Sequence, residues 1–230
     1  MIKKLMEHGN TGGLNWIDQF DLFLFDFDGL LVNTEELHWM AYKELCRKHG
    51  IELEWSLNQF FEHAHLSAEG IQKALYPRFF KGEVWGDLYA EKKEIYQSLL
   101  KKGHLTLMKG AESVLKALEQ ANKKRCVVTH SPKASVDLIK NKLGVLQTIP
   151  HWFTRESYRE PKPHPDGYLT ALKALAEPGD RVIGFEDSVR GLTALKRAGV
   201  QIALLVCPPD HPQLGPPLSF YPSLLDIELG

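Results

Sequence analysis

Two carboxylates at the end of an apolar run are the most informative chemical feature of this sequence. The stretch 23–29 reads FLFDFDG, so Asp26 and Asp28 lie two residues apart where the hydrophobic run ends. A buried strand explains the hydrophobic residues but not two acids at its end. If the strand geometry persists, both side chains point to the same face. A carboxylate nucleophile at Asp26, general acid–base catalysis by Asp28 and a bound Mg²⁺ would explain them, which is chemistry for cleaving phosphate esters.

Polar residues also accompany three other apolar segments of the sequence. The stretch 129–133 reads THSPK, the stretch 160–163 reads EPKP, and the stretch 186–188 reads EDS. In a parallel sheet the carboxyl ends of the strands meet at one edge, and ligands bind there. We therefore expect all four polar clusters to lie together, although they are far apart in the sequence.

The elements that would position these clusters are short strands alternating with helices. Five apolar segments have the composition of buried strands: residues 22–27, 125–130, 151–154, 181–185 and 201–206. Helices are predicted over 111–122, over 165–175, and from Ser188 to the residue before Gly199. This alternation predicts an α/β fold with βαβ units, a mainly parallel sheet and right-handed crossovers.

The alternation of strands and helices stops between residues 34 and 104. This stretch has helical patterns and no convincing strand. Asn33 can cap its first helix, with Glu36 reaching back to the start. We therefore predict a helical cap domain over residues 34–104, placed above the carboxyl edge of the sheet. Residues 1–33 and 105–230 would form the Rossmann-like core domain.

Composition and charge argue against several other classes of protein. Hydrophobic residues make up 43% and charged residues 25% of the 230 residues, and the formal net charge is −1. This balance gives no general attraction to nucleic acid or to a membrane surface. Cys46, Cys126 and Cys207 share no close spacing, so we expect buried thiols in a reducing compartment.

The first ten residues lack the apolar core of a signal peptide. The sequence also has no run of roughly 18 apolar residues that could span a bilayer. We therefore expect a cytoplasmic protein that binds no membrane, with a monomer as the default state.

The four polar clusters, with a helical insert between the first and the second, resemble the motifs of the haloacid dehalogenase (HAD) superfamily. The resemblance is to the subgroup with an α-helical cap, which includes β-phosphoglucomutase and many sugar-phosphate phosphatases. It extends over nearly the whole chain from about residue 20. It implies a Mg²⁺-dependent phosphatase that hydrolyses a small phosphorylated metabolite, with a sugar phosphate expected, through an aspartyl-phosphate intermediate.

A cation is expected beside the two aspartates, because carboxylates and a phosphate dianion repel one another. Mg²⁺ prefers oxygen ligands and is typically held by one or two carboxylates together with a substrate phosphate. We expect Asp26 and Asp187 to supply those carboxylates and Glu186 to support them from behind. The resemblance adds the backbone carbonyl of Asp28. A helix cap within residues 186–188 would be compatible with this role.

The second and third clusters have the residue types of a phosphate site. Ser131 followed by Pro132 has the pattern of a helix N-cap and first helical residue, and a helix N-terminus offers free N–H groups to an anion. The resemblance implies that Thr129 binds phosphate, with His130 beside it. Lys162 lies between two prolines in stiff, extended backbone. The resemblance implies that Lys162 binds the phosphoryl group and neutralises the nucleophile.

Several residues of the helical insert are further candidates. The resemblance gives His38 a place at the hinge of the cap, although a histidine on a helix surface has the same pattern. Lys93 could reach the cleft or lie on a solvated helix face. His63 and His65 alternate as strand neighbours would, but two histidines alone make a poor metal site.

Three alternatives to a phosphatase follow from the same residues. A mutase of the β-phosphoglucomutase type would need an arginine in the cap, which residues 64–70 lack and Arg78 could replace. A dehalogenase of the superfamily lacks the second aspartate, so Asp28 argues against that activity. A binding protein with this fold would have lost catalytic groups, yet all of them are present: Asp26, Asp28, Lys162 and Asp187.

Overall fold

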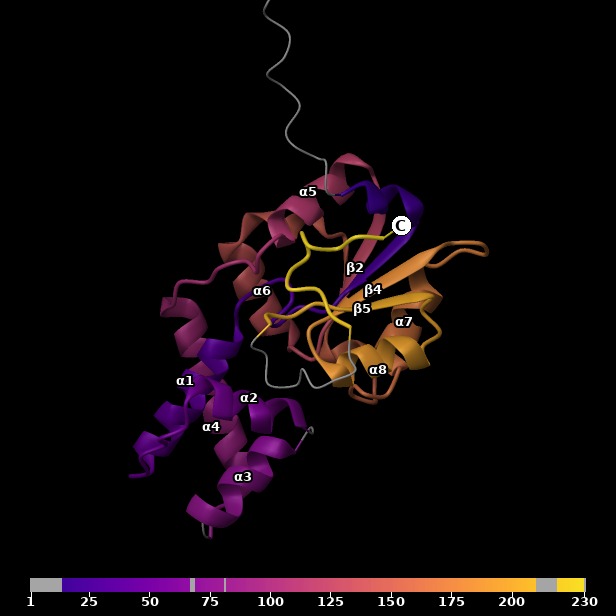
Figure 1. Ribbon diagram of the computed structural model, residues 1–230. Helices are drawn as coiled ribbons and strands as arrows, with labels where there is room; N and C mark the ends of the chain where they lie inside the picture. The colour runs from indigo at the N-terminus through magenta and orange to yellow at the C-terminus, as the bar shows by residue number, and fades with distance from the viewer. Residues whose placement is uncertain (1–13, 67–68, 81, 210–218, 230) are drawn as a thin grey trace, which may run out of the picture.

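The computed structural model describes residues 14–66, 69–80, 82–209 and 219–229. Its centre is a five-stranded sheet with the strand order β3-β2-β1-β4-β5 (Figure 1). Every neighbouring pair of strands is parallel, which confirms the predicted fold class. The strands are β1 (Leu22–Phe25), β2 (Lys124–Val128), β3 (His151–Phe153), β4 (Val182–Glu186) and β5 (Ile202–Leu205).

Helices cover both faces of the sheet, because successive side chains of a strand point to opposite faces. On one face, Phe23 and Phe25 of β1 share a hydrophobic cluster with α5 and α6. On the other face, Leu22 and Leu24 share a cluster with α7 and α8. The bounds of these elements are α5 (Ala111–Gln120), α6 (Lys133–Lys142), α7 (Asp166–Leu175) and α8 (Val189–Arg197), with the 3₁₀ helices η1 (Asn15–Gln19), η2 (Gly144–Thr148) and η3 (Arg155–Ser157).

The predicted strands and helices of the core lie close to the observed ones. The first two strands were predicted to reach Phe27 and His130 but end two residues earlier, at Phe25 and Val128. The chain turns just beyond the first of them, where the N–H of Leu31 donates to the carbonyl of Phe27 at 2.9 Å. At the other end of the core, Gly199 follows α8 with a φ of 80°, as predicted.

The stretch between β1 and α5 forms a group of helices beside the core, which we call the helical insert (Figure 1). Among its described residues there are helices and no named strand. Helix α1 packs along α4, and Leu45 and Leu100 are among their fully buried side chains. The bounds are α1 (Glu35–Lys48), α2 (Leu57–Leu66), α3 (Gly70–Phe79) and α4 (Trp85–Lys102).

Two antiparallel segments connect the helical insert to the core. The N–H of Asn33 donates to the carbonyl of Thr106 at 3.0 Å, and the N–H of Met108 donates to the carbonyl of Leu31 at 2.9 Å. Thr34, not Asn33, takes the N-cap position of α1, so the predicted cap was one residue early. The predicted domain boundaries at 33/34 and 104/105 fall beside this connection and stay a prediction. None of the described helices has the length and apolar character needed to cross a membrane.

Candidate active site

The four polar clusters meet at the carboxyl edge of the sheet. They surround a pocket of about 80 Å³, which we call the inner pocket. Every residue that the sequence predicts for the site lies on its wall, so the structure brings all of them together, while their roles stay predictions. The lining residues are Asp26, Asp28, Glu35, Thr129, His130, Lys162, Glu186, Asp187, Ser188 and Arg190.

Lys162 is bound to the first aspartate. Its Nζ donates to Asp26 Oδ1 at 2.5 Å, to Glu186 Oε1 at 2.6 Å and to the carbonyl of Val128 at 3.0 Å. Burial opposes the charge of the ammonium, but the carboxylates of Asp26 and Glu186 outweigh it and raise the pKa of Lys162. Lys162 is therefore protonated at physiological pH and stays beside Asp26.

Asp28 is surrounded by hydroxyl groups. Its Oδ1 accepts a hydrogen bond from Thr34 Oγ1 at 2.6 Å. Its Oδ2 accepts from Ser131 Oγ at 2.7 Å and from Thr129 Oγ1 at 3.3 Å. Burial raises the pKa of Asp28 to about 6, and the hydrogen bonds from Thr34 and Ser131 oppose that rise. A carboxyl group with this pKa can both give and take a proton near neutral pH.

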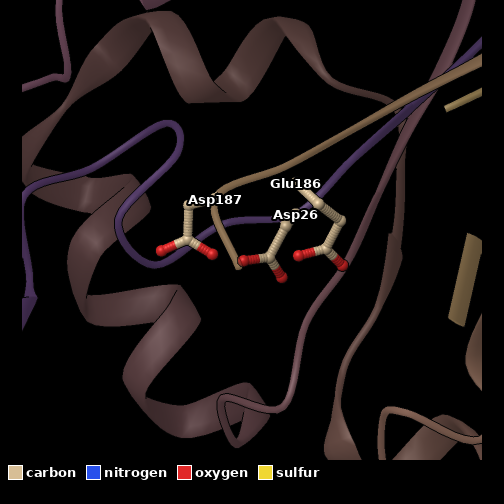
Figure 2. Close-up of side chains that lie close together, drawn as sticks. All are labelled: Asp26, Glu186 and Asp187. Carbon is tan, nitrogen blue, oxygen red and sulfur yellow. The ribbon is translucent and has the colours of Figure 1, made fainter. Parts of the chain in front are cut away.

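Asp26, Glu186 and Asp187 form a buried group of carboxylates (Figure 2). One oxygen of each lies within 4.8 Å of the others. Burial raises the pKa of Glu186 and of Asp187, and the charge of Asp26 adds to the rise. Three carboxylates beside the single ammonium of Lys162 leave excess negative charge, which a cation would neutralise. The donors are all oxygens, as Mg²⁺ prefers, and Glu186 Oε2 is buried without a hydrogen-bond partner among the described residues, so this group fits Mg²⁺.

Two glycines let the backbone approach these carboxylates. A Cβ atom at Gly29 would lie 2.1 Å from Asp187 Oδ2, and the φ of 78° at Gly29 is in the left-handed region that glycine adopts freely. A Cβ atom at Gly191 would lie 1.8 Å from Glu186 Oε2. Any side chain at either position would therefore displace a carboxylate of the group.

Helix α7 supports Glu186, and helix α8 begins just after the carboxylate group. The hydroxyl of Tyr168, a fully buried residue of α7, donates to Glu186 Oε1. Ser188 caps α8 by accepting a hydrogen bond from the N–H of Gly191 at 3.1 Å. The cap predicted within residues 186–188 is thus confirmed, and it is compatible with Asp187 facing the inner pocket.

The helix start predicted at Ser131 and Pro132 is wrong. Helix α6 begins at Lys133, and Pro132 takes the N-cap position. The Ser131 hydroxyl instead donates to Asp28, because a buried carboxylate without donors is more costly than a solvated helix end. The Ser131 N–H donates to Thr129 Oγ1 at 2.9 Å, so the Thr129 oxygen accepts one hydrogen bond while its own proton makes the long, 3.3 Å hydrogen bond to Asp28.

His130 is held as a neutral imidazole. Its Nε2 accepts a hydrogen bond from the backbone N–H of Lys162 at 2.8 Å. Because a backbone N–H only donates, Nε2 carries no proton and the ring proton is on Nδ1. Burial lowers the pKa of His130 to about 2, and the positive charges of Lys162 and Arg190 act in the same direction. The ring therefore offers a hydrogen-bond donor at Nδ1 throughout the physiological range.

A space of about 440 Å³, which we call the cleft, lies between the helical insert and the core. Glu35, His130 and Arg190 line both the inner pocket and the cleft, so a ligand can extend from one into the other. A larger groove of about 840 Å³ runs along α1 and residues 50–54. None of the described residues that line it belongs to the four polar clusters, so this larger space is not the candidate active site. The aromatic lining residues of the cleft are Tyr42, Phe60, Trp85 and Tyr89.

Lys92, the neighbour of the predicted Lys93, is the lysine of the cleft. Its Nζ donates to His38 Nδ1 at 2.7 Å and lies 4.9 Å and 5.0 Å from the ring centroids of Tyr42 and Tyr96. The ring of His38 stacks on Tyr96 at 4.0 Å. Burial lowers the pKa of Lys92 to about 7 and the pKa of His38 to about 3. Lys93 is exposed on α4, the second of the two positions considered for it.

Other expectations for the helical insert are changed by the structure. Arg78 is exposed, stacks 5.0 Å from the ring of Phe79, and is absent from the described residues that line the cleft. His63 lies in helix α2, 4.4 Å from the ring of Trp55, so the strand-like alternation with His65 is wrong. The side chain of His65 lies outside the described part of the chain.

No role in the site was predicted for Thr34, Tyr168 or Arg190. Thr34, at the start of α1, donates to Asp28, and Tyr168, inside α7, donates to Glu186. Neither residue belongs to one of the four polar clusters. Arg190 lies in the first turn of α8, three residues after Asp187. Its closeness to the last polar cluster was the only available signal.

An α/β fold with this group of carboxylates at its edge defines a class of hydrolase, and comparison with known proteins identifies it. The family model for haloacid dehalogenase-like hydrolases matches residues 23–205. This is most of the chain, so the protein belongs to the haloacid dehalogenase-like hydrolase family. The predicted enzyme class, a phosphoric monoester hydrolase of this type, is confirmed.

Several relatives share most of their length with this chain. Validoxylamine A 7'-phosphate phosphatase of Streptomyces hygroscopicus subsp. limoneus is 31% identical, over 79% of this chain and 83% of its own. Protein CbbY of Cereibacter sphaeroides is 28% identical, over 79% and 82%. The crystal structure of CbbY from Rhodobacter sphaeroides with phosphate has a TM-score of 0.68 at 27% identity, covering 83% of this chain and 86% of that chain. A β-phosphoglucomutase from Clostridium difficile shares the fold, with a TM-score of 0.67 at 23% identity, covering 84% and 86%.

Proposed function

We propose that this protein is a Mg²⁺-dependent phosphatase that hydrolyses a small sugar phosphate through an aspartyl-phosphate intermediate. The observation that carries the proposal is the arrangement of Asp26, paired with Lys162, two residues before a second carboxyl group, Asp28, that is hydrogen-bonded by hydroxyls. A nucleophile and an acid–base group are thus presented on the same pocket wall.

The reaction has two steps. In the first, the carboxylate of Asp26 attacks phosphorus, the bond to the leaving oxygen breaks, and Asp28 gives that oxygen its proton. In the second, Asp28 takes a proton from water as the water attacks the aspartyl-phosphate, and the bond between phosphorus and Asp26 breaks. Inorganic phosphate leaves and both carboxyl groups return to their starting states.

Lys162 and Thr129 bind and orient the phosphoryl group. Lys162 is permanently charged and lies beside Asp26, where it stabilises the charge on the transferring group. The Thr129 hydroxyl, whose hydrogen bond to Asp28 is 3.3 Å long, can rotate to donate its proton to a phosphoryl oxygen instead. Asp26, Asp187 and the backbone carbonyl of Asp28 would hold Mg²⁺, with Glu186 behind them. When bound, the metal neutralises charge on the phosphoryl oxygens.

The helical insert, residues 34–104, acts as a cap in this proposal. Its side chains supply most of the cleft lining, so its position decides how much water reaches the inner pocket. The paired segments around Asn33 and Thr106 are the connection about which it would open and close. We also propose a cytoplasmic location, supported by three buried free thiols, which are typical of reducing compartments. The monomeric state stays a prediction.

The substrate class is supported by the names of the relatives. One relative is a phosphatase of validoxylamine A 7'-phosphate, and another, from Thermotoga maritima, is a phosphorylated carbohydrates phosphatase. A mutant of CbbY from Rhodobacter sphaeroides was crystallised with xylulose-(1,5)bisphosphate. A mutase is less favoured, because Arg78 lies outside the set of described residues that line the cleft.

The proposal is tested by phosphate release from a panel of sugar phosphates, with Mg²⁺ and with EDTA. We expect release only with the metal, and loss of release in Asp26→Asn, which keeps the shape of the side chain but removes the nucleophile. Asp18→Asn, an exposed change in η1, is the matched control and should keep full activity. An active Asp26→Asn protein would exclude the aspartyl-phosphate mechanism. Conversion of glucose 1-phosphate without phosphate release would favour the mutase.

A further inference from the structure

Arg190 is a cation of the site that the proposed reaction does not use. It lies in the first turn of α8, two residues after the N-cap Ser188. Its side chain lines both the inner pocket and the cleft. Among the described residues, its Nε is buried without a hydrogen-bond partner. Arg190 as a whole is half-buried, but a buried N–H without a partner is unfavourable, so a ligand group is expected to accept the hydrogen bond of its Nε.

His130 offers a second donor on the same wall. Its Nε2 is taken by the backbone N–H of Lys162, so its proton is on Nδ1. With Nε2 used in this way, the Nδ1–H is the hydrogen-bond donor that the neutral ring presents. His130 also lines both spaces, as Arg190 does. The core side of the cleft therefore carries a permanent cation and a fixed neutral donor next to the inner pocket.

The wall of the cleft formed by the helical insert has no unpartnered cation for an anion among its described residues. Of the charged side chains that line the cleft among the described residues, Lys92 donates to His38 and lies over two tyrosine rings. Its ammonium is thus already partnered inside the helical insert. Glu35, the first residue of α1, lines both the cleft and the inner pocket, and its negative charge disfavours an anion on the side of the helical insert. A second anionic group on a ligand would therefore bind on the core side.

We propose that Arg190, with the Nδ1–H of His130, binds a second anionic group of the substrate, and that the enzyme therefore selects phosphate esters that carry a second phosphate or a carboxylate. This inference rests on the proposed function and names its substrate class. The phosphoryl group to be transferred lies in the inner pocket, and the second anion lies where the inner pocket opens into the cleft. Arginine suits this position because its planar fork binds phosphate or carboxylate through two hydrogen bonds.

The experiment compares matched pairs of substrates that differ by one anionic group. Fructose 1,6-bisphosphate against fructose 6-phosphate tests a second phosphate, and 3-phosphoglycerate against glycerol 3-phosphate tests a carboxylate. We expect wild-type kcat/KM to favour the doubly anionic member of at least one pair by about 10- to 100-fold, the size of one charge-assisted hydrogen bond. The pair that shows the preference identifies the second anion.

Arg190→Gln should lower kcat/KM for the favoured substrate by about tenfold more than for its singly anionic partner. Arg190→Lys, which keeps the charge but not the fork, should recover part of the preference. Lys196→Gln, on the exposed end of the same helix, removes the same charge and should keep the wild-type preference. An unchanged preference in Arg190→Gln, or no preference in the wild type, would overturn the inference.

A binding measurement separates this inference from the proposed function. Calorimetry of the same ligand pairs, with Mg²⁺, uses the Asp26→Asn protein, which cannot turn over by the proposed mechanism, and the Asp26→Asn, Arg190→Gln double variant. Tighter binding of the doubly anionic ligand that disappears with Arg190 supports the inference even if the wild type releases no phosphate. Phosphate release without any such difference in binding supports the proposed function and rejects the inference.

Discussion

Replacing Gly29 with alanine tests how the backbone builds the carboxylate group. The new Cβ would lie 2.1 Å from Asp187 Oδ2 and 3.1 Å from its Cγ, so the carboxylate must move. The φ of 78° adds a backbone cost of about 1–2 kcal/mol for an L-residue in the left-handed region. Gly199→Ala is the matched control, because its φ is 80° and a Cβ there meets none of the described atoms within 4 Å.

Gly29→Ala and Gly199→Ala should lose similar stability but differ in Mg²⁺ binding. Both should lose about 1–2 kcal/mol of unfolding free energy, which lowers the melting temperature by about 2–8 °C for a chain of this size. Gly29→Ala alone should weaken Mg²⁺ binding by about 10- to 100-fold, or about 1.4–2.8 kcal/mol, because Asp187 is displaced. The assays are thermal unfolding with and without Mg²⁺, and phosphate release across a Mg²⁺ titration.

The comparison has a clear negative result. If both variants show the same Mg²⁺ midpoint and the same Mg²⁺-induced rise in melting temperature, then the contact between position 29 and Asp187 does not position a metal ligand. If Gly199→Ala loses Mg²⁺ binding as well, the loss comes from general destabilisation. Either result would refute the reasoning from the 2.1 Å approach.

Two further predictions follow from the charges of the inner pocket. The pKa of Asp28 is raised from 3.8 to about 6 in the folded protein. Ionisation of Asp28 therefore lowers the free energy of unfolding as the pH rises from 3.8 to about 6, and below pH 3.8 this loss is absent. The free energy of unfolding of Asp28→Asn at pH 8 should therefore exceed that of the wild type by up to about 3 kcal/mol. This gain should be gone by about pH 4. Lys162→Met should lose about 3–5 kcal/mol of unfolding free energy at pH 8, because it leaves the carboxylates of Asp26 and Glu186 buried without their cation. Part of that loss should be recovered at pH 5, where Glu186 takes up a proton. The control is Lys93→Met, on the exposed face of α4, which should change the free energy of unfolding little at either pH.

Equilibrium denaturation at the two pH values decides both predictions. A gain in Asp28→Asn that does not depend on pH would mean that burial of the charge is not its cause. A loss in Lys162→Met that is the same at pH 5 and pH 8 would mean that packing, and not the buried charges, sets the cost.

The core of the fold and most of the site could be predicted from local patterns. Apolar runs such as 181–185 identify strands because a strand buried on both faces has no polar alternation. The rule that parallel strands end at one edge then places Asp26, Thr129 and Asp187 together without any knowledge of their contacts. The strand ends do not follow from the same pattern, because Phe25 and Phe27 are both apolar and only the turn beyond them ends the pairing.

The sequence by itself therefore determined the parallel sheet, the helical insert and the residues gathered at the sheet edge. Tertiary structure decided which neighbours these residues bind. Ser131 has the local pattern of a helix cap, but its hydroxyl donates to a carboxylate that lies 103 residues away in the chain. Lys92 and Lys93 are equivalent in sequence, and only the packing of α4 against α1 decides which of them is buried. Local propensity depends on nearby residues, whereas these contacts depend on distant ones, so they exist only once the chain has folded.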